Sequence, residues 1–73
     1  MPASTPKPGP KAPPLDKLAL MILIKESAKF SKLKGLSMEQ AVEEAVQSIS
    51  NRYGVEVDRN LARMLVAEVY NEQ

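Results

Sequence analysis

The sequence contains no cysteine, no histidine and no tryptophan, and these absences exclude several classes of site. Without cysteine there is no disulfide framework and no thiolate nucleophile, and without cysteine or histidine a structural zinc site lacks plausible ligands. Histidine is also the commonest general base, so catalysis would depend on lysine, serine or carboxylate groups. A chain of 73 residues has little room for a substrate pocket of ~300 Å³ or more. We therefore expect that the protein is not an enzyme and that it binds no metal and no cofactor.

Long hydrophobic runs are also missing, apart from the seven apolar residues LALMILI at 18–24. This run is far shorter than the ~20 residues that a bilayer-spanning helix requires. Lys25 and Glu26 follow it directly and end it. We therefore expect a cytoplasmic protein without a membrane span.

Positive charge is scarce in the second half of the chain. Residues 1–35 hold all seven lysines against two acidic residues, which gives a net charge of +5. Residues 36–73 hold all three arginines against seven acidic residues, which gives −4. Such asymmetry predicts two surfaces with different partners, or one surface that favours an acidic partner.

Proline is absent after residue 14, and this divides the chain into two parts. All six prolines fall within residues 1–14, where there is almost no apolar bulk, so we expect this Pro/Lys-rich N-terminal arm to be disordered. Beyond the arm, Gly35 and Gly54 separate stretches with helical periodicity. The predicted helices cover residues 15–33, 38–53 and 59–71. The fold expected for residues 15–73 is therefore an all-α, small three-helix domain.

Capping residues mark the starts of these predicted helices. Asp16 and Asp58 are suited to begin the first and the third helix. Ser37 followed by Gln40 has the spacing of a capping box, which is the clearest local signal in the sequence. Because the connections are short, consecutive helices should pack on each other.

The LALMILI run raises the question of how much of the first helix is buried. At 100° per residue, one side of this helix collects enough apolar residues to meet the other two helices: Leu15, Ala19, Ile22, Leu23, Phe30 and Leu33. A surplus of apolar residues points elsewhere and borders a row of lysines: Leu20, Met21 and Ile24, beside Lys25, Lys29 and Lys32.

Two interpretations of this surplus remain open. In one, the first helix is the central helix and its neighbours cover it on two sides. In the other, Leu20, Met21 and Ile24 stay partly exposed and act as apolar anchors for a protein partner or for a second copy of the chain. The lysine row would then supply steering charges, and Arg59 and Arg63 would form a second patch.

Direct DNA binding is an alternative function. The helices on either side of Gly54 superficially resemble a helix-turn-helix, with Arg59, Asn60 and Arg63 near the start of the second one. The helix before Gly54 is about twice as long as the first helix of that motif. In addition, the net charge of −4 in this half of the chain opposes binding to phosphates. Direct nucleic-acid binding is thus the weaker hypothesis, and a homodimeric, antitoxin-like helical module is a third.

The chain has the general character of a known group of proteins. The features that it shares with them are its short length, its lack of cysteine, the MPASTPKPGPKAPP arm and the LALMILI helix. The chain resembles the small bacteriophage-encoded regulators that bind bacterial RNA polymerase. This resemblance implies a transcription regulator that acts in the host bacterial cytoplasm. It would bind near the N-terminus of the β′ subunit, inhibit initiation and promote antitermination through a protein–protein interaction.

Overall fold

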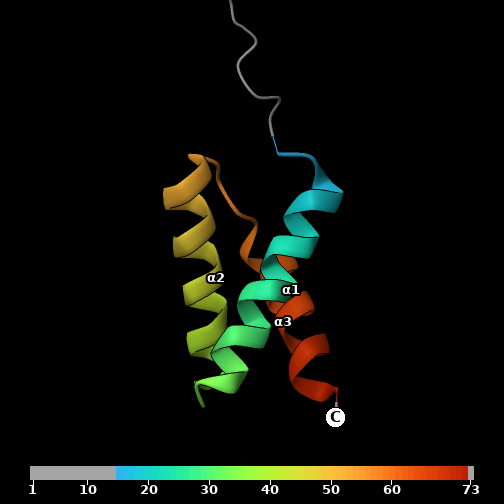
Figure 1. The fold of residues 1–73 in the computed structure, drawn as a ribbon. Helices are drawn as coiled ribbons and strands as arrows, with labels where there is room; N and C mark the ends of the chain where they lie inside the picture. Colours follow the sequence, from blue (N-terminus) through green and yellow to red (C-terminus); the bar gives the residue numbers. More distant parts are fainter. Residues whose placement is uncertain (1–14, 73) are drawn as a thin grey trace, which may run out of the picture.

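The computed structural model describes residues 15–72, which form three α-helices: α1 (Lys17–Leu33), α2 (Met38–Tyr53) and α3 (Arg59–Asn71). In Figure 1, α2 runs antiparallel to α1, and α3 runs in the same general direction as α1. Each helix contacts the other two. The predicted all-α, three-helix domain is confirmed, and the predicted arm, residues 1–14, lies outside the described residues. Within residues 15–72, no helix is long and apolar enough to cross a lipid bilayer.

Each helix begins at a side chain that accepts a hydrogen bond from an amide of the first turn. The carboxylates of Asp16 and Asp58 accept at 2.8 and 2.9 Å, respectively. The predicted capping box is present, because the amide of Gln40 donates to Ser37 Oγ at 3.2 Å and the amide of Ser37 donates to Gln40 Oε1 at 3.0 Å. These bonds satisfy amides that have no partner within the helix.

The first two helices end at glycines with left-handed backbone, where φ is +82° at Gly35 and +67° at Gly54. After α1, the amide of Leu36 donates to the carbonyl of Ser31 at 3.0 Å, which is the long bond of a Schellman turn. After α2, the amide of Gly54 donates to the carbonyl of Ser50 at 2.8 Å. Glycine suits both positions because a positive φ brings Cβ of other residues into steric conflict.

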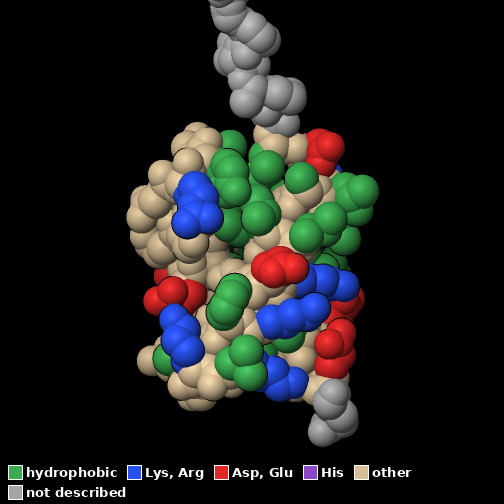
Figure 2. Space-filling model, viewed as in Figure 1, with side chains coloured by type: hydrophobic (Ala, Val, Ile, Leu, Met, Phe, Trp, Pro, Cys, Tyr) green, Lys and Arg blue, Asp and Glu red, His purple; other side chains and the backbone are tan. Residues whose placement is uncertain are grey.

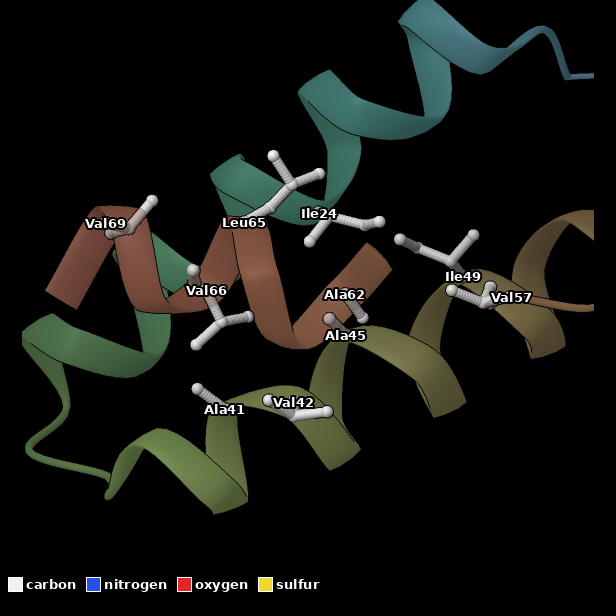
Figure 3. Packing of buried hydrophobic residues seen from close by; sticks show 11 residues of the cluster. Ile24, Ala41, Val42, Ala45, Ile49, Val57, Ala62, Leu65, Val66 and Val69 are labelled. Atoms are coloured by element: carbon white, nitrogen blue, oxygen red, sulfur yellow. The ribbon is translucent and has the colours of Figure 1, made fainter. Parts of the chain in front are cut away.

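The core lies between the three helices and consists largely of alanine and valine (Figure 3). Small side chains let helix axes approach closely and keep the interior densely packed. Only two apolar residues of α1 are buried, whereas α2 and α3 contribute four each and the α2–α3 connection adds one. The buried apolar residues are Ile24, Ala28, Ala41, Val42, Ala45, Ile49, Val57, Ala62, Leu65, Val66 and Val69.

The side of α1 that meets the core differs from the sequence-based prediction. Ile24, which one of the two interpretations left partly exposed, has 0 % of its surface accessible. Ile22, Phe30 and Leu33, which were expected to face the core, are 53 %, 64 % and 83 % exposed. The other three residues predicted for the core face, Leu15, Ala19 and Leu23, are half-buried.

Residue size explains this rotation of α1. Ile24, Ala28 and Ser31 follow one another at spacings of four and three, and all three are buried. The two small residues let both neighbouring helices come close to α1. A prediction based on the largest apolar residues therefore selects the wrong side of the helix.

Two polar contacts, one between α1 and α3 and one between α3 and the α1–α2 connection, support this rotation of α1. Lys32 Nζ donates to the carbonyl oxygens of Val69 at 3.0 Å and Glu72 at 2.7 Å, so the lysine binds the C-terminal carbonyls of α3. The hydroxyl of Tyr70 donates to the carbonyl of Leu36 at 2.7 Å, just after α1 ends. With Lys32 facing α3, Phe30 points to the far side, because two residues turn a helix by about 200°.

Candidate functional site

The side of α1 that faces away from the core carries four large apolar side chains. Leu18, Ile22, Phe30 and Leu33 have exposed fractions of 68, 53, 64 and 83 %. At about 100° per residue they lie within an arc of about 120°. Two exposed charged residues lie between them on the same side. We call the following six residues the outer face of α1: Leu18, Ile22, Glu26, Lys29, Phe30 and Leu33.

In Figure 2, hydrophobic side chains gather over the N-terminal part of α1 and the adjoining end of α2. Acidic and basic side chains cross the middle of the same view, and hydrophobic ones appear again below them. Single exposed apolar residues are normal on protein surfaces, whereas gathered ones mark interaction sites. The exposed apolar residues of the outer face of α1 are gathered on one side of a helix, so this face is a candidate interaction site.

A groove between α1 and α2 adjoins the outer face and has a volume of about 550 Å³, which is more than was expected for so short a chain. Ile22 and Phe30 belong both to the outer face and to the lining of this groove. Leu23, Ile49 and Tyr53 add further apolar surface to the lining. The groove therefore extends the apolar surface of α1 towards α2.

Short side chains explain why α1 and α2 leave this space between them. Ser27 and Ser31 of α1 and Ser48 of α2 line the groove, where larger residues would fill it. Charged residues of both signs also contribute: Glu26, Lys34, Glu44 and Arg52. Within residues 15–72, no group of three or more acidic side chains could hold a metal ion. The groove offers a ligand apolar side chains with charges around them, which is the composition of many protein-binding surfaces.

The structure corrects the predicted anchors. Ile24 lies inside the core and cannot reach a partner in the folded protein, so the interpretation that left it partly exposed as an anchor is wrong for this residue. Leu20 and Met21 are half-buried and pack against the core cluster. The surplus of apolar surface on α1 is present, but it lies on the opposite side, around Ile22 and Leu33.

The predicted row of lysines is mostly engaged within the domain. Lys25 Nζ lies 3.4 Å from a carboxylate oxygen of Glu68 on α3. Lys32 donates to the last carbonyls of α3 and lies 5.9 Å from the ring centroid of Tyr70. Lys29 is exposed and forms no ion pair within residues 15–72. Of the three lysines, Lys29 has its charge most available to a partner.

The predicted second patch lies at the seam between α2 and α3. The guanidinium of Arg59 donates to both carboxylate oxygens of Glu43, with Nη2 at 3.2 Å from Oε1. This hydrogen bonding lowers the pKa of Glu43 and raises the pKa of Arg59. Arg63 is exposed and lines a shallow depression beside this pair. Because Arg59 is paired, less positive charge is free here to meet a nucleic-acid backbone.

Comparison of the chain with protein-family models, with curated proteins and with solved structures found no significant match. The candidate site therefore rests on geometry alone, namely the outer face of α1 and the groove beside it.

Sequence reasoning missed Leu18 as a surface residue and placed Ile22, Phe30 and Leu33 on the wrong side of α1. A signal for the correct side was present in the sequence. Small residues at one spacing along a helix mark the side where another helix packs closely, and Ala28 has this role in α1. The size of the residues was thus more informative than their hydrophobicity.

Proposed function

We propose that this protein is a non-enzymatic regulator that binds another protein through the outer face of α1 and the adjoining groove. The observation that supports the proposal is the exposure of four large apolar side chains on one side of a single helix. Moving apolar surface out of water contributes about 25 cal/mol per Å², so covering this face is favourable. A partner that covers it would gain affinity without any chemical step.

The groove is suited to bind a partner segment that carries one or two large apolar side chains. Phe30 and Tyr53 stand at the groove and are 64 % and 44 % exposed. Some aromatic side chains, tyrosine among them, are enriched among the residues that contribute most to binding energy. The charged residues around the groove would then set the orientation of the segment.

We infer that the partner is bacterial RNA polymerase, at the N-terminal region of its β′ subunit. Support for this partner comes from the resemblance of the chain to small phage-encoded regulators. The bound protein would inhibit initiation and promote antitermination by occupying a surface of the enzyme, and it would do so in the bacterial cytoplasm. The outer face of α1 supplies a surface suited to such occupancy.

A matched pair of substitutions tests the proposal. Ile22 on the outer face and Met64 on α3 have the same exposed fraction, 53 %. In capture of purified bacterial RNA polymerase by the tagged chain, Ile22→Asp should weaken binding at least about tenfold, because it places a charge in an apolar interface. Met64→Asp is the control for an equal loss of apolar surface and should bind like the wild type.

Three outcomes would contradict the proposal. The wild type could fail to capture the polymerase, both variants could bind equally well, or both could lose binding while circular dichroism shows them folded. The alternative function has a different signature. Binding to duplex DNA that survives Ile22→Asp and weakens steeply with added salt would indicate a DNA-binding protein instead.

A further inference from the structure

The order of residue types along the outer face of α1 is symmetric. Read from either end, two apolar residues come first, two charged residues of opposite sign follow, and two apolar residues come last. From its N-terminal to its C-terminal end, the face carries two apolar residues, one acid, one base and two apolar residues. Glu26 and Lys29 form the centre of the pattern and are both exposed. Neither forms an ion pair with another side chain in residues 15–72. The central part of such a face, with one acid and one base, is complementary to itself.

We propose that this face binds a second copy of the same chain, with the two α1 helices packed antiparallel around a two-fold axis. The symmetry places Glu26 of each copy opposite Lys29 of the other, so two equivalent ion pairs form. A parallel arrangement would place Glu26 against Glu26 and Lys29 against Lys29. Facing like charges disfavour that arrangement, so the charges select the antiparallel one.

Two of the four apolar residues of the outer face, Ile22 and Leu33, fit the same register. Ile22 lies four residues before Glu26, and Leu33 lies four residues after Lys29. In an antiparallel pair these offsets coincide, so Ile22 of one copy lies opposite Leu33 of the second copy. The contact then consists of a central pair of ion pairs with an apolar pair on each side.

The spacing of these residues also matches a helix–helix seam. Ile22, Glu26, Lys29 and Leu33 follow at intervals of four, three and four, as in the a and d positions of a coiled coil. In coiled coils, polar residues at such positions fix register and orientation at some cost in stability. Glu26 and Lys29 are the polar residues at the two central positions of this seam.

The groove gives the second copy a further contact. Phe30 lies on the side of α1 that borders the groove, and the two-fold axis keeps the groove sides of both copies together. In the register set by Glu26 and Lys29, Phe30 of the second copy lies level with residue 25. It is then next to Ile22 and Leu23 at the entrance of the groove, where both residues belong to the lining.

The size of the contact sets the expected strength. Residues 18–33 span about 24 Å at a rise of about 1.5 Å per residue. One helix of this length buries less than the roughly 800 Å² per partner of a standard interface. Small interfaces are typical of weak, transient complexes, so we expect the dimer to dissociate at low micromolar concentration. The dimer uses the surface assigned above to a protein partner, but its formation does not depend on that partner's identity.

Charge exchange tests the antiparallel pairing. In sedimentation of the full chain from a few to several hundred micromolar, the wild type should shift from one copy towards two. Glu26→Lys and Lys29→Glu should each weaken dimer formation at least about tenfold, because like charges then face each other. An equimolar mixture of the two variants restores both ion pairs and should associate like the wild type. So should the double variant that carries both exchanges.

Several results would overturn the dimer. The wild type could remain a single copy at the highest concentration, or both single variants could dimerise like the wild type. A mixture no better than its components would exclude the proposed register. Both side chains are exposed, so circular dichroism should show all variants folded. Polymerase capture is measured separately. A dimer without capture removes only the proposed function, and capture without a dimer removes only this inference.

Discussion

Replacing Ile24 and Ile22 one at a time by alanine tests the rotation of α1, on which the assignment of the outer face depends. The two residues are identical in type and lie two positions apart on the same helix. Their surroundings differ completely, since Ile24 is 0 % exposed and Ile22 is 53 % exposed. The difference between the two variants therefore measures burial and little else.

Ile24→Ala should abolish most of the stability of the domain. The side chain lies among residues from all three helices, and truncating a buried isoleucine to alanine costs about 2–5 kcal/mol. A single core of this size supplies only about 3–5 kcal/mol of net stability. At the upper end of this range, the variant would be largely unfolded without denaturant.

Ile22→Ala should cost less than about 1 kcal/mol. Full burial of an isoleucine side chain contributes about 1.5–3 kcal/mol, and only about half of the Ile22 surface is removed from water. Alanine also favours a helix more than isoleucine does, by a few tenths of a kcal/mol. The two contributions have opposite signs, so the net change is small.

Urea unfolding followed by far-ultraviolet circular dichroism measures both variants. The experiment belongs at a low micromolar concentration, where the proposed dimer is dissociated. With an m-value of about 1 kcal/mol/M, Ile24→Ala should lower the midpoint by at least about 2 M and Ile22→Ala by less than about 1 M. Equal shifts, or a larger shift for Ile22→Ala, would refute the rotation of α1 and with it the outer face.

Two further predictions concern polar contacts. Lys32→Met keeps the apolar stem but removes the donor to the last carbonyls of α3, so the free energy of unfolding should fall by about 1–2 kcal/mol, whereas Lys29→Met should change it by less than about 0.5 kcal/mol in the same urea assay. The lowered pKa of Glu43 means that its pairing with Arg59 stabilises the fold fully above the usual glutamate pKa, and that this stabilisation is lost as the pH falls through the lowered value. An NMR titration should show the Glu43 pKa returning towards its usual value in Arg59→Gln, and an unchanged pKa would exclude the pairing in solution.

The helix boundaries could be predicted because short-range chemistry determines them. Asp16, Ser37 and Asp58 accept hydrogen bonds from amides two or three residues away. Gly35 and Gly54 adopt the positive φ that ends a helix. All of these interactions lie within a few residues of the chain, so the order of residues contains them.

The rotation of α1 was not predicted from the hydrophobic pattern, because that pattern does not determine it. In LALMILI nearly every direction around the helix is apolar, so the hydrophobic pattern selects no side. Besides the small residues of α1, two distant contacts stabilise the observed rotation: the hydrogen bond from Lys32 to Val69, 37 residues away, and the one from Tyr70 to Leu36, 34 residues away. Neither pairing has a signature in the local sequence.

Close packing against small residues and an exposed apolar face are two consequences of the same arrangement. Because Ala28 and Ser31 face the neighbouring helices, Phe30 and Leu33 are left on the outside. Two neighbours cannot cover a helix that is apolar on nearly all sides, so some apolar surface stays uncovered whichever side is buried. The expectation of a contact surface on α1 follows from this excess, and it does not depend on which side the excess occupies. What changes is the set of residues that a partner would meet, which includes Ile22 and not Ile24. Comparison of the variants at these two positions tests which side of α1 is exposed.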